Sequence, residues 1–342
     1  MYILFSAGFL FTGCSTLHNI SIVQIEVLEP ARFELPDTVK KIGIVNRLPV
    51  LNDSVLNQGA KLKSKSDLYT THPLTNNHAE LYIRILKEIL ENSGRFEKIV
   101  EIDEKYISDS DSLSILPVSN KEINKIRNSN PDLDYLFFLD LLTNDELTIF
   151  LSNLGLYRKE ILFTTLLQIA VTKPETETYY YNKTDTLRWE GEAFTTYEMK
   201  RNLPSNEEAV FAGLEESANM FANIFVPHWE RVERMMYMTG NYEMKMAQKL
   251  ALENDWTSAA AIWTKFVDNK NRNIRAKATY NLALANEING DMNTAFEWIL
   301  KSYFVFEESN PEHAFNTKEY IRVLAKRKND IKKLDKQLTF KD

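Results

Sequence analysis

Apolar residues recur with clear periods along most of the chain, and these periods predict the order of its elements. A loose alternation over residues 18–36 predicts an early strand and a linker, and an apolar run flanked by charge at 40–47 is typical of a buried strand. Residues 79–92 place their apolar side chains on one helical face, and Gly94 is a stop signal after them. We expect a further strand at 96–100.

The same order then repeats. A helix is predicted over residues 119–128 and a strand over 135–140, whereas the polar, irregular stretch at 49–78 predicts a long loop. Alternation of strand, helix and strand indicates an α/β layer whose sheet is at least partly parallel. We therefore expect an α/β or α+β amino-terminal domain with a mixed sheet.

The pattern changes from residue 163 onward. Residues 163–172 and 184–194 are rich in β-branched and aromatic residues and flank a polar, turn-like segment at 173–178, which predicts a hairpin. Ser205 followed by Glu208 is a capping box, so a helix is expected to begin there and to continue to Pro227.

The carboxy-terminal part contains an internal repeat. Residues 247–266 align with residues 283–302, a period similar to that of tetratricopeptide repeats, in which small residues let paired helices touch. An ordinary helical bundle is the alternative. Helices at 229–238 and 317–327 would cap the two repeats. The residues predicted to form the repeat core are Ala247, Trp256, Ala259, Trp263, Ala283, Gly290, Ala295 and Trp298.

The first residues resemble a lipoprotein signal peptide. Residues 1–13 are almost wholly apolar but too few to span a bilayer, and Phe11-Thr12-Gly13-Cys14 resembles the lipobox of bacterial lipoproteins. That resemblance implies acylation of Cys14, and a small residue in a buried helix is the alternative. Because the segment is short and lacks Lys and Arg, we expect the true start to lie a few codons upstream.

Lipidation and charge restrict the location and the partners. Two or more acyl chains would hold the protein stably on a membrane. Residues 15–17 contain neither the aspartate linked to retention in the inner membrane nor the acidic stretch linked to export to the cell surface. We therefore expect the protein to lie on the periplasmic face of a Gram-negative outer membrane. A formal net charge of −7 argues against nucleic acid as a partner.

The search for catalytic chemistry finds little. Nucleophile elbows, phosphate loops and dinucleotide fingerprints are missing from the sequence. His72 and His78 could bind a metal ion together with Asp67, but a hydrated loop is the preferred interpretation. We therefore expect neither a metal nor a cofactor. Three carboxylates bracket the strand at 135–140, namely Asp132, Asp134 and Asp140. Without a His or metal partner, turn and solubilising roles are favoured over acid–base chemistry.

Three consecutive tyrosines lie beside the predicted hairpin turn: Tyr179, Tyr180 and Tyr181. Exposed tyrosines are favoured as anchors in protein interfaces, so they are candidates for binding a protein partner. The alternative is that every second one packs against the sheet.

The element order also resembles two protein families. The strand at 40–45, the helix stop and strand at 94–100, the strand at 134–139, the hairpin at 163–194 and the helix at 206–226 resemble the α/β domain of the curli-secretion protein CsgG and of TolB. With the lipobox and the repeats, the chain resembles an uncharacterised lipoprotein family of unknown function, whose typical segments match residues 184–191 and 229–244. Neither resemblance implies a catalytic residue.

These observations define the predicted organisation and function. Residues 1–13 are the signal peptide, 14–37 a tether and early strand, 38–227 the α/β domain, and 228–342 the tetratricopeptide-like domain. The leading hypothesis is a non-catalytic lipoprotein that binds envelope proteins through its repeats. The alternatives are an accessory subunit of a secretion or assembly system, which would oligomerise through the α/β domain, and an envelope enzyme.

Overall fold

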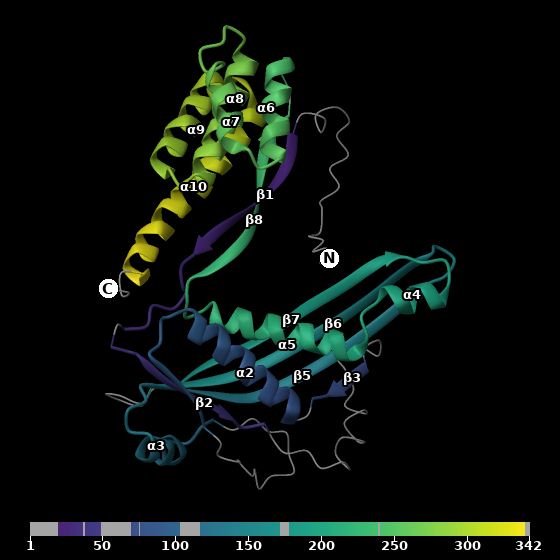
Figure 1. Cartoon of the computed structure of the whole chain (residues 1–342), viewed down its shortest axis with the longest axis vertical. Helices are drawn as coiled ribbons and strands as arrows, with labels where there is room; N and C mark the ends of the chain where they lie inside the picture. The colour runs from purple at the N-terminus through teal and green to yellow at the C-terminus, as the bar shows by residue number, and fades with distance from the viewer. Residues whose placement is uncertain are drawn as a thin grey trace. The chain divides into compact units, whose positions relative to one another are not determined.

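The structure is a computed structural model that describes residues 20–36, 38–48, 70–74, 76–102, 117–171, 178–238 and 240–338 (Figure 1). Cys14, its neighbours and residues 172–177 of the predicted hairpin turn lie outside the described residues. None of the helices described is both long enough and apolar enough to cross a membrane. The chain divides into two compact units, one of residues 31–226 and one that combines residues 20–30 with the chain from 227 onward.

The first unit contains one mixed sheet, in the order β4-β2-β5-β6-β7, with β3 paired to β5. Strand β2 is parallel to both β4 and β5, whereas β5, β6 and β7 are antiparallel neighbours. The predicted mixed sheet is therefore present. The strands are β2 (Lys41–Asn46), β3 (Thr70–Pro73), β4 (Lys98–Ile102), β5 (Tyr135–Leu151), β6 (Leu156–Val171) and β7 (Thr178–Glu192).

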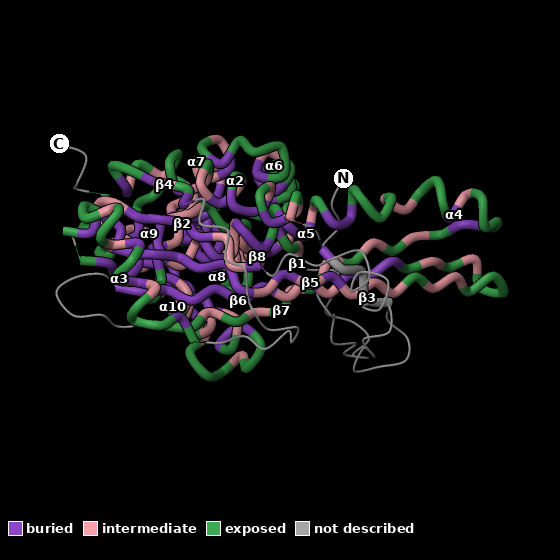
Figure 2. Tube along the Cα trace, turned by 90° about the horizontal axis from the view of Figure 1, so that it is seen from below, coloured by how far each residue is buried: buried purple, intermediate pink, exposed green. Residues whose placement is uncertain are grey.

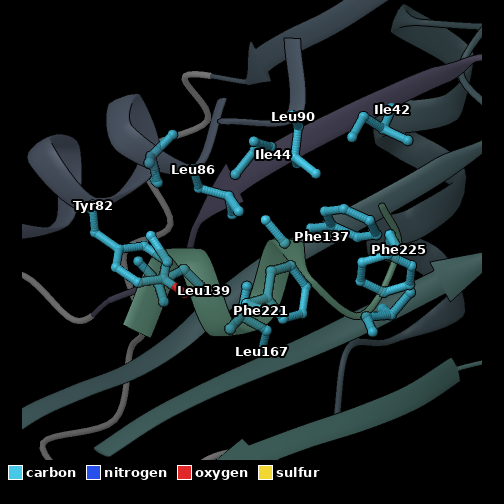
Figure 3. Close-up of a cluster of buried hydrophobic side chains, with 14 of the residues drawn as sticks. Ile42, Ile44, Tyr82, Leu86, Leu90, Phe137, Leu139, Leu167, Phe221 and Phe225 are labelled. Atoms are coloured by element: carbon cyan, nitrogen blue, oxygen red, sulfur yellow. The ribbon is translucent and has the colours of Figure 1, made fainter. Parts of the chain in front are cut away.

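Helices cover both faces of this sheet. The helices are α2 (Asn76–Asn92), α3 (Asn120–Ser129), α4 (Thr196–Asn202) and α5 (Asn206–Ala222). Strand alternation sends Ile42 and Ile44 into the core shared with α2 and α5, and Val45 into the smaller core under α3. The larger core is rich in aromatic rings, and Figure 3 shows Phe137 beside Phe221 and Phe225, with ring centroids 5.3 and 5.1 Å away.

Local signals explain where the helices of this unit begin. Ser119, Thr195 and Ser205 each cap a helix, and in all three cases a Glu three residues later completes a capping box. The box at Ser205 confirms the prediction made from the sequence.

The predicted loop at 49–78 is wrong in its last part. Residues 70–73 pair with Thr143–Glu146 of β5, and α2 already begins at Asn76. A four-residue polar edge strand has no apolar alternation that could have marked it.

Strands β5, β6 and β7 are much longer than predicted. Their outer parts, next to α4, consist mostly of intermediate or exposed residues (Figure 2). Strands β5 and β6 pair without interruption from Leu141↔Leu166 to Leu151↔Leu156. Backbone hydrogen bonds therefore extend these two strands into a region where the burial of apolar side chains contributes little to stability. Hydrophobic periodicity is weak there, and for that reason the sequence did not mark the extension.

The second unit is helical and carries one two-stranded ribbon. Its elements are β1 (Ile20–Glu29), β8 (His228–Tyr237), α6 (Tyr242–Leu252), α7 (Trp256–Thr264), α8 (Arg272–Ile288), α9 (Met292–Phe306), the short 3-10 helix η2 (Glu307–Ser309) and α10 (Pro311–Leu338). Consecutive helices from α6 to α10 pack against one another, and β8 packs against α8. The predicted helical carboxy-terminal region is therefore present.

The capping helix expected at 229–238 is instead strand β8. It pairs along its whole length with β1, from Ile20↔Tyr237 to Glu29↔His228, and the inward residues Val23, Ile25 and Val27 join the helical core. Glu, Arg and Met favour a helix locally, but pairing with a segment some two hundred residues earlier overrides that preference.

The internal repeat has the same turn in both copies. Asn254 and Gly290 adopt left-handed conformations with φ of 67° and 81°, and the next residues, Asp255 and Asp291, cap α7 and α9. Gly290 was predicted to belong to the repeat core, but it is exposed and a Cβ there would meet nothing within 4 Å. Its position is required by backbone conformation rather than by packing.

Candidate functional site

The second unit carries a pocket along one side of α9. Trp298, Lys301 and Phe304 are spaced three residues apart, so they project from one face of that helix. The pocket has a volume of about 460 Å³. Its lining residues are Val267, Asp268, Arg275, Thr279, Trp298, Lys301, Phe304 and Val305.

The pocket combines aromatic surface with positive charge. The Lys301 ammonium lies 4.2 Å from the centre of the Trp298 ring, a cation–π contact, and Phe304 is 63% exposed. Arg275 is held in place because its Nη1 donates to the carbonyl of Asn269 at 2.8 Å. Two cations, Lys301 and Arg275, and one carboxylate, Asp268, line the pocket. This excess of positive charge beside aromatic surface suits a ligand in which an acidic group lies next to an apolar one.

Trp298 was predicted to be a repeat-core residue, and the structure gives it two environments. It is half-buried and packs against the helical core, where its neighbour Ile299 is fully buried, and it also lines the pocket. The spacing of Trp298, Lys301 and Phe304, an aromatic, a basic and an aromatic residue three positions apart, could have indicated this pocket. The repeat alignment compares the two copies and does not take this spacing into account. The other predicted core positions, Ala247, Trp256, Ala259, Trp263, Ala283 and Ala295, are buried.

The carboxylate Asp140 belongs to a buried ion-pair cluster. A bulge between Leu139 and Leu141 displaces it from the ladder, and Arg47 at the end of β2 reaches its Oδ1 at 3.1 Å. The Arg47 Nε also lies 3.3 Å from Oε1 of Glu122 on α3. Burial raises the pKa of Asp140 to about 6, and the Arg47 charge opposes that shift.

This cluster joins α3 to the sheet. Glu122 completes the cap of α3 with its other oxygen, and Gln168 on β6 accepts from the backbone N–H of Val118 at 2.8 Å. Each described group is therefore engaged with another part of the same unit, an arrangement that favours a structural role for Asp140.

The other two aspartates, Asp132 and Asp134, contact residues of the neighbouring strands. Asp134 accepts hydrogen bonds from the backbone N–H groups of Lys40 and Lys41 at 2.8 and 2.9 Å, which aligns the starts of β2 and β5. Asp132 lies 3.4 Å from the ammonium groups of both Lys41 and Lys98. The expected turn and solubilising role suits the exposed Asp132, but it is wrong for Asp140, which is buried in the ion-pair cluster.

The three tyrosines lie at the beginning of β7 and differ in exposure. Tyr181 is half-buried against Phe221, at a centroid distance of 5.1 Å, and burial raises its pKa to about 12. Tyr179 and Tyr180 are 42% and 56% exposed. Because side chains alternate along a strand, Tyr180 projects from the face opposite to its two neighbours.

A hydrogen-bonded network that was not anticipated connects β8 to the helices. The Tyr237 hydroxyl contacts Nδ1 of His313 at 3.0 Å, and Nε2 of His313 contacts the carbonyl of Ser302 at 3.0 Å. Asn281 bonds both the N–H and the C=O of Tyr237. The participants come from four different elements, β8, α8, α9 and α10, so no sequence pattern connects them.

The candidate metal ligands His72 and His78 lie on two different elements, strand β3 and helix α2. Asp67 lies outside the described residues, and within the described ranges no three His, Cys, Asp or Glu side chains are grouped to hold an ion. His228 begins strand β8 beside Trp229, which is 69% exposed.

Comparisons with known proteins connect the chain to proteins without an assigned role. A family described as Domain of unknown function (DUF8603) matches residues 39–237, and another, Domain of unknown function (DUF6340), matches residues 245–326. The crystal structure of a minor lipoprotein from Acinetobacter baumannii is similar at 12% identity and a TM-score of 0.25, over 54% of this chain and 88% of that chain. No curated protein matches the chain.

Proposed function

The chain belongs to the family described as Domain of unknown function (DUF8603), and from its own residues we propose a function. It is a non-catalytic, lipid-anchored protein of the cell envelope that binds a protein partner through its helical unit. The observation that carries this proposal is the pocket beside α9, where Trp298, Lys301 and Phe304 lie on one helical face.

The chemistry of the pocket defines the partner. Trp298 and Phe304 offer apolar surface, while Lys301 and Arg275 offer donors for a carboxylate. The ligand is a protein segment in which an acidic group, either a side chain or a chain end, lies next to an aromatic or aliphatic side chain.

The helices that carry the pocket form two tetratricopeptide-like repeats in this proposal. In support, the left-handed residue, the Asp cap and the buried Ala positions recur in both copies. The resemblance of the α/β unit to CsgG and TolB supports an envelope setting. Cys14 would anchor the chain in the outer membrane, facing the periplasm.

The test selects ligands without assuming their identity. The full chain with Cys14→Ser is used to select peptides from a displayed random library, and the binding of selected peptides is measured by titration. We expect acidic–aromatic motifs, and we expect Trp298→Ala and Lys301→Glu each to weaken binding about tenfold or more. Lys245→Glu, an exposed lysine on α6 outside the pocket, is the matched control.

Two results would overturn the proposal. The first is a selection without acidic–aromatic peptides. The second is binding that Lys301→Glu and Lys245→Glu affect equally. Anchoring is tested separately, by incorporation of a fatty-acid analogue that Cys14→Ala should abolish; label retained in that variant would refute it.

A further inference from the structure

Strand β7 is the last strand of the described sheet, and one of its two edges is paired. It bonds with β6 from Leu156↔Glu192 to Ala170↔Thr178. It spans 15 residues and contains no proline. A long edge strand presents a row of backbone donors and acceptors that a further strand can use. We propose that β7 pairs antiparallel with β7 of a second copy of this chain, centred on Thr184.

Symmetry restricts the registers that such a pair can adopt. Two copies of one antiparallel strand are related by a two-fold axis perpendicular to the sheet, so the residue at the centre faces itself. A residue that lies a given number of positions before the centre then faces the residue that lies the same number of positions after the centre in the second copy. The two side chains of each such pair lie on the same face of the sheet. Registers centred on Lys183, Asp185 or Arg188 would each oppose a charge to the same charge, which is destabilising.

The register centred on Thr184 instead matches opposite charges. Lys183 faces Asp185 of the second copy, and the symmetric contact repeats this pair. Registers centred on Thr186 or Leu187 place no opposite charges directly against each other. A register centred on Trp189 would oppose Arg188 to Glu190, but it could pair only residues 186–192, whereas the Thr184 register pairs residues 178–190. Because edge charges normally prevent indiscriminate pairing, the same residues give this contact its specificity.

The side chains of Lys183 and Asp185 are already poised for this arrangement. Within one copy the Lys183 Nζ lies 3.1 Å from Oδ1 of Asp185. The second oxygen of Asp185 is buried and has no hydrogen-bond partner among the described residues. A buried, unsatisfied carboxylate oxygen is costly, and the ammonium group of a second Lys183 would supply a donor.

The same register also brings the tyrosines at the start of β7 to the interface, where Tyr179 already contacts the Phe33 ring of its own copy at a centroid distance of 6.1 Å. Tyr180, which is 56% exposed, faces Arg188 of the second copy, and Tyr179, 42% exposed, faces Trp189. Aromatic pairs and cation–π contacts across strands each stabilise a sheet modestly. The interface therefore continues the sheet of one copy into that of the other.

The first experiment measures self-association of the full chain with Cys14→Ser by analytical ultracentrifugation. We expect a concentration-dependent dimer. Lys183→Asp opposes Asp to Asp and should raise the dimer dissociation constant about tenfold, whereas Lys183→Asp combined with Asp185→Lys should restore it. The matched control is Glu192→Lys, since this acidic residue lies on β7 beyond the paired segment and should change little.

The second experiment tests the register and does not depend on how well the charge variants fold. In the Cys14→Ser background no other cysteine is present, and Thr184→Cys should form a disulfide between copies under mild oxidation. Residues that face each other lie about 4.5–5.5 Å apart, within disulfide range. Thr186→Cys, also exposed, faces residue 182 and lies about 13 Å from its copy, so it should not crosslink.

A monomer at all concentrations, or equal crosslinking at positions 184 and 186, would overturn the proposal. Failure of the double charge exchange to restore association would exclude the Thr184 register as well. Because the peptide pocket lies on the other unit, Trp298→Ala should leave self-association unchanged, so the two proposals can fail independently.

Discussion

His313 is held neutral in the interior of the helical unit. Burial lowers its pKa from the ordinary value of 6.5, and the nearby Lys277 acts in the same direction, while the Ser302 carbonyl opposes them. With its Nε2–H donated to that carbonyl, Nδ1 accepts from the Tyr237 hydroxyl, which in turn accepts from Asn316. A protonated imidazole donates at both nitrogens, so Nδ1 could no longer accept the hydrogen bond from the Tyr237 hydroxyl.

This arrangement predicts a pH dependence of stability. Below about pH 6.5 this histidine binds a proton in the unfolded chain but stays neutral in the folded protein, because its pKa is lower there. The free energy of unfolding therefore falls as the pH drops, by at most about 1.4 kcal/mol per pH unit. Above that value His313 contributes no dependence. We expect amide hydrogen exchange in α8–α10 to accelerate between pH 7 and pH 5.5.

The control for this prediction is His313→Gln, which removes the titrating group. It should lower stability at neutral pH and flatten the pH dependence of exchange in α8–α10. An unchanged pH dependence in that variant would show that another group is responsible.

At the scale of elements, α5 approaches the sheet closely because Gly213 has no side chain. A Cβ there would lie 2.7 Å from Cδ2 of Phe163 and 3.3 Å from Cδ1 of Ile161, both buried on β6. Gly213→Ala gains helix propensity of up to about 1 kcal/mol but forces helix and strand apart. We expect net destabilisation of about 1–3 kcal/mol, measured by urea unfolding.

Glu215→Ala is the matched control on the same helix. Glu215 is exposed, so its replacement by alanine should stay within about 0.5 kcal/mol of the wild type. If Gly213→Ala were the more stable protein, the close contact between α5 and β6 would not be the reason for this glycine.

At the scale of the whole molecule, the two ends of the chain build one unit. Strand β1 pairs with β8, and α10 holds it further, since Lys326 contacts Glu29 at 2.9 Å and Arg327 donates to the Leu28 carbonyl at 2.8 Å. The first unit is thus inserted between two segments of the second. Stability of the helical unit therefore depends on residues far from it in the sequence.

The corresponding prediction concerns Ile25, a buried residue of β1 in the helical core. Ile25→Ala leaves a cavity and should destabilise the helical unit by about 2–4 kcal/mol, with faster hydrogen exchange in α6–α10 and unchanged exchange in α2 and α5. Glu26→Ala, whose side chain is exposed, is the control. Slower or unchanged exchange in α6–α10 would contradict the role assigned to β1.

Local signals predicted much of both units. The helix that begins at Asn206 follows from its capping box, the helix that begins at Asn120 follows from its apolar spacing, and the repeated helical pairs follow from the alignment of residues 247–266 with 283–302. The candidate site was predicted less well. Trp298 was identified as a buried aromatic, but its contact with Lys301 depends on which face of α9 its neighbours leave open.

The sequence by itself determined the periods, the caps and the turns, because these depend on residues within a few positions of one another. The tertiary structure alone decided that residues 228–237 are a strand, that Asp140 is buried beside Arg47, and that His313 meets Tyr237. Each of these depends on a partner from another part of the chain. Pairing and burial at that range override local preference, since the free energy of a buried strand or ion pair is set by its surroundings.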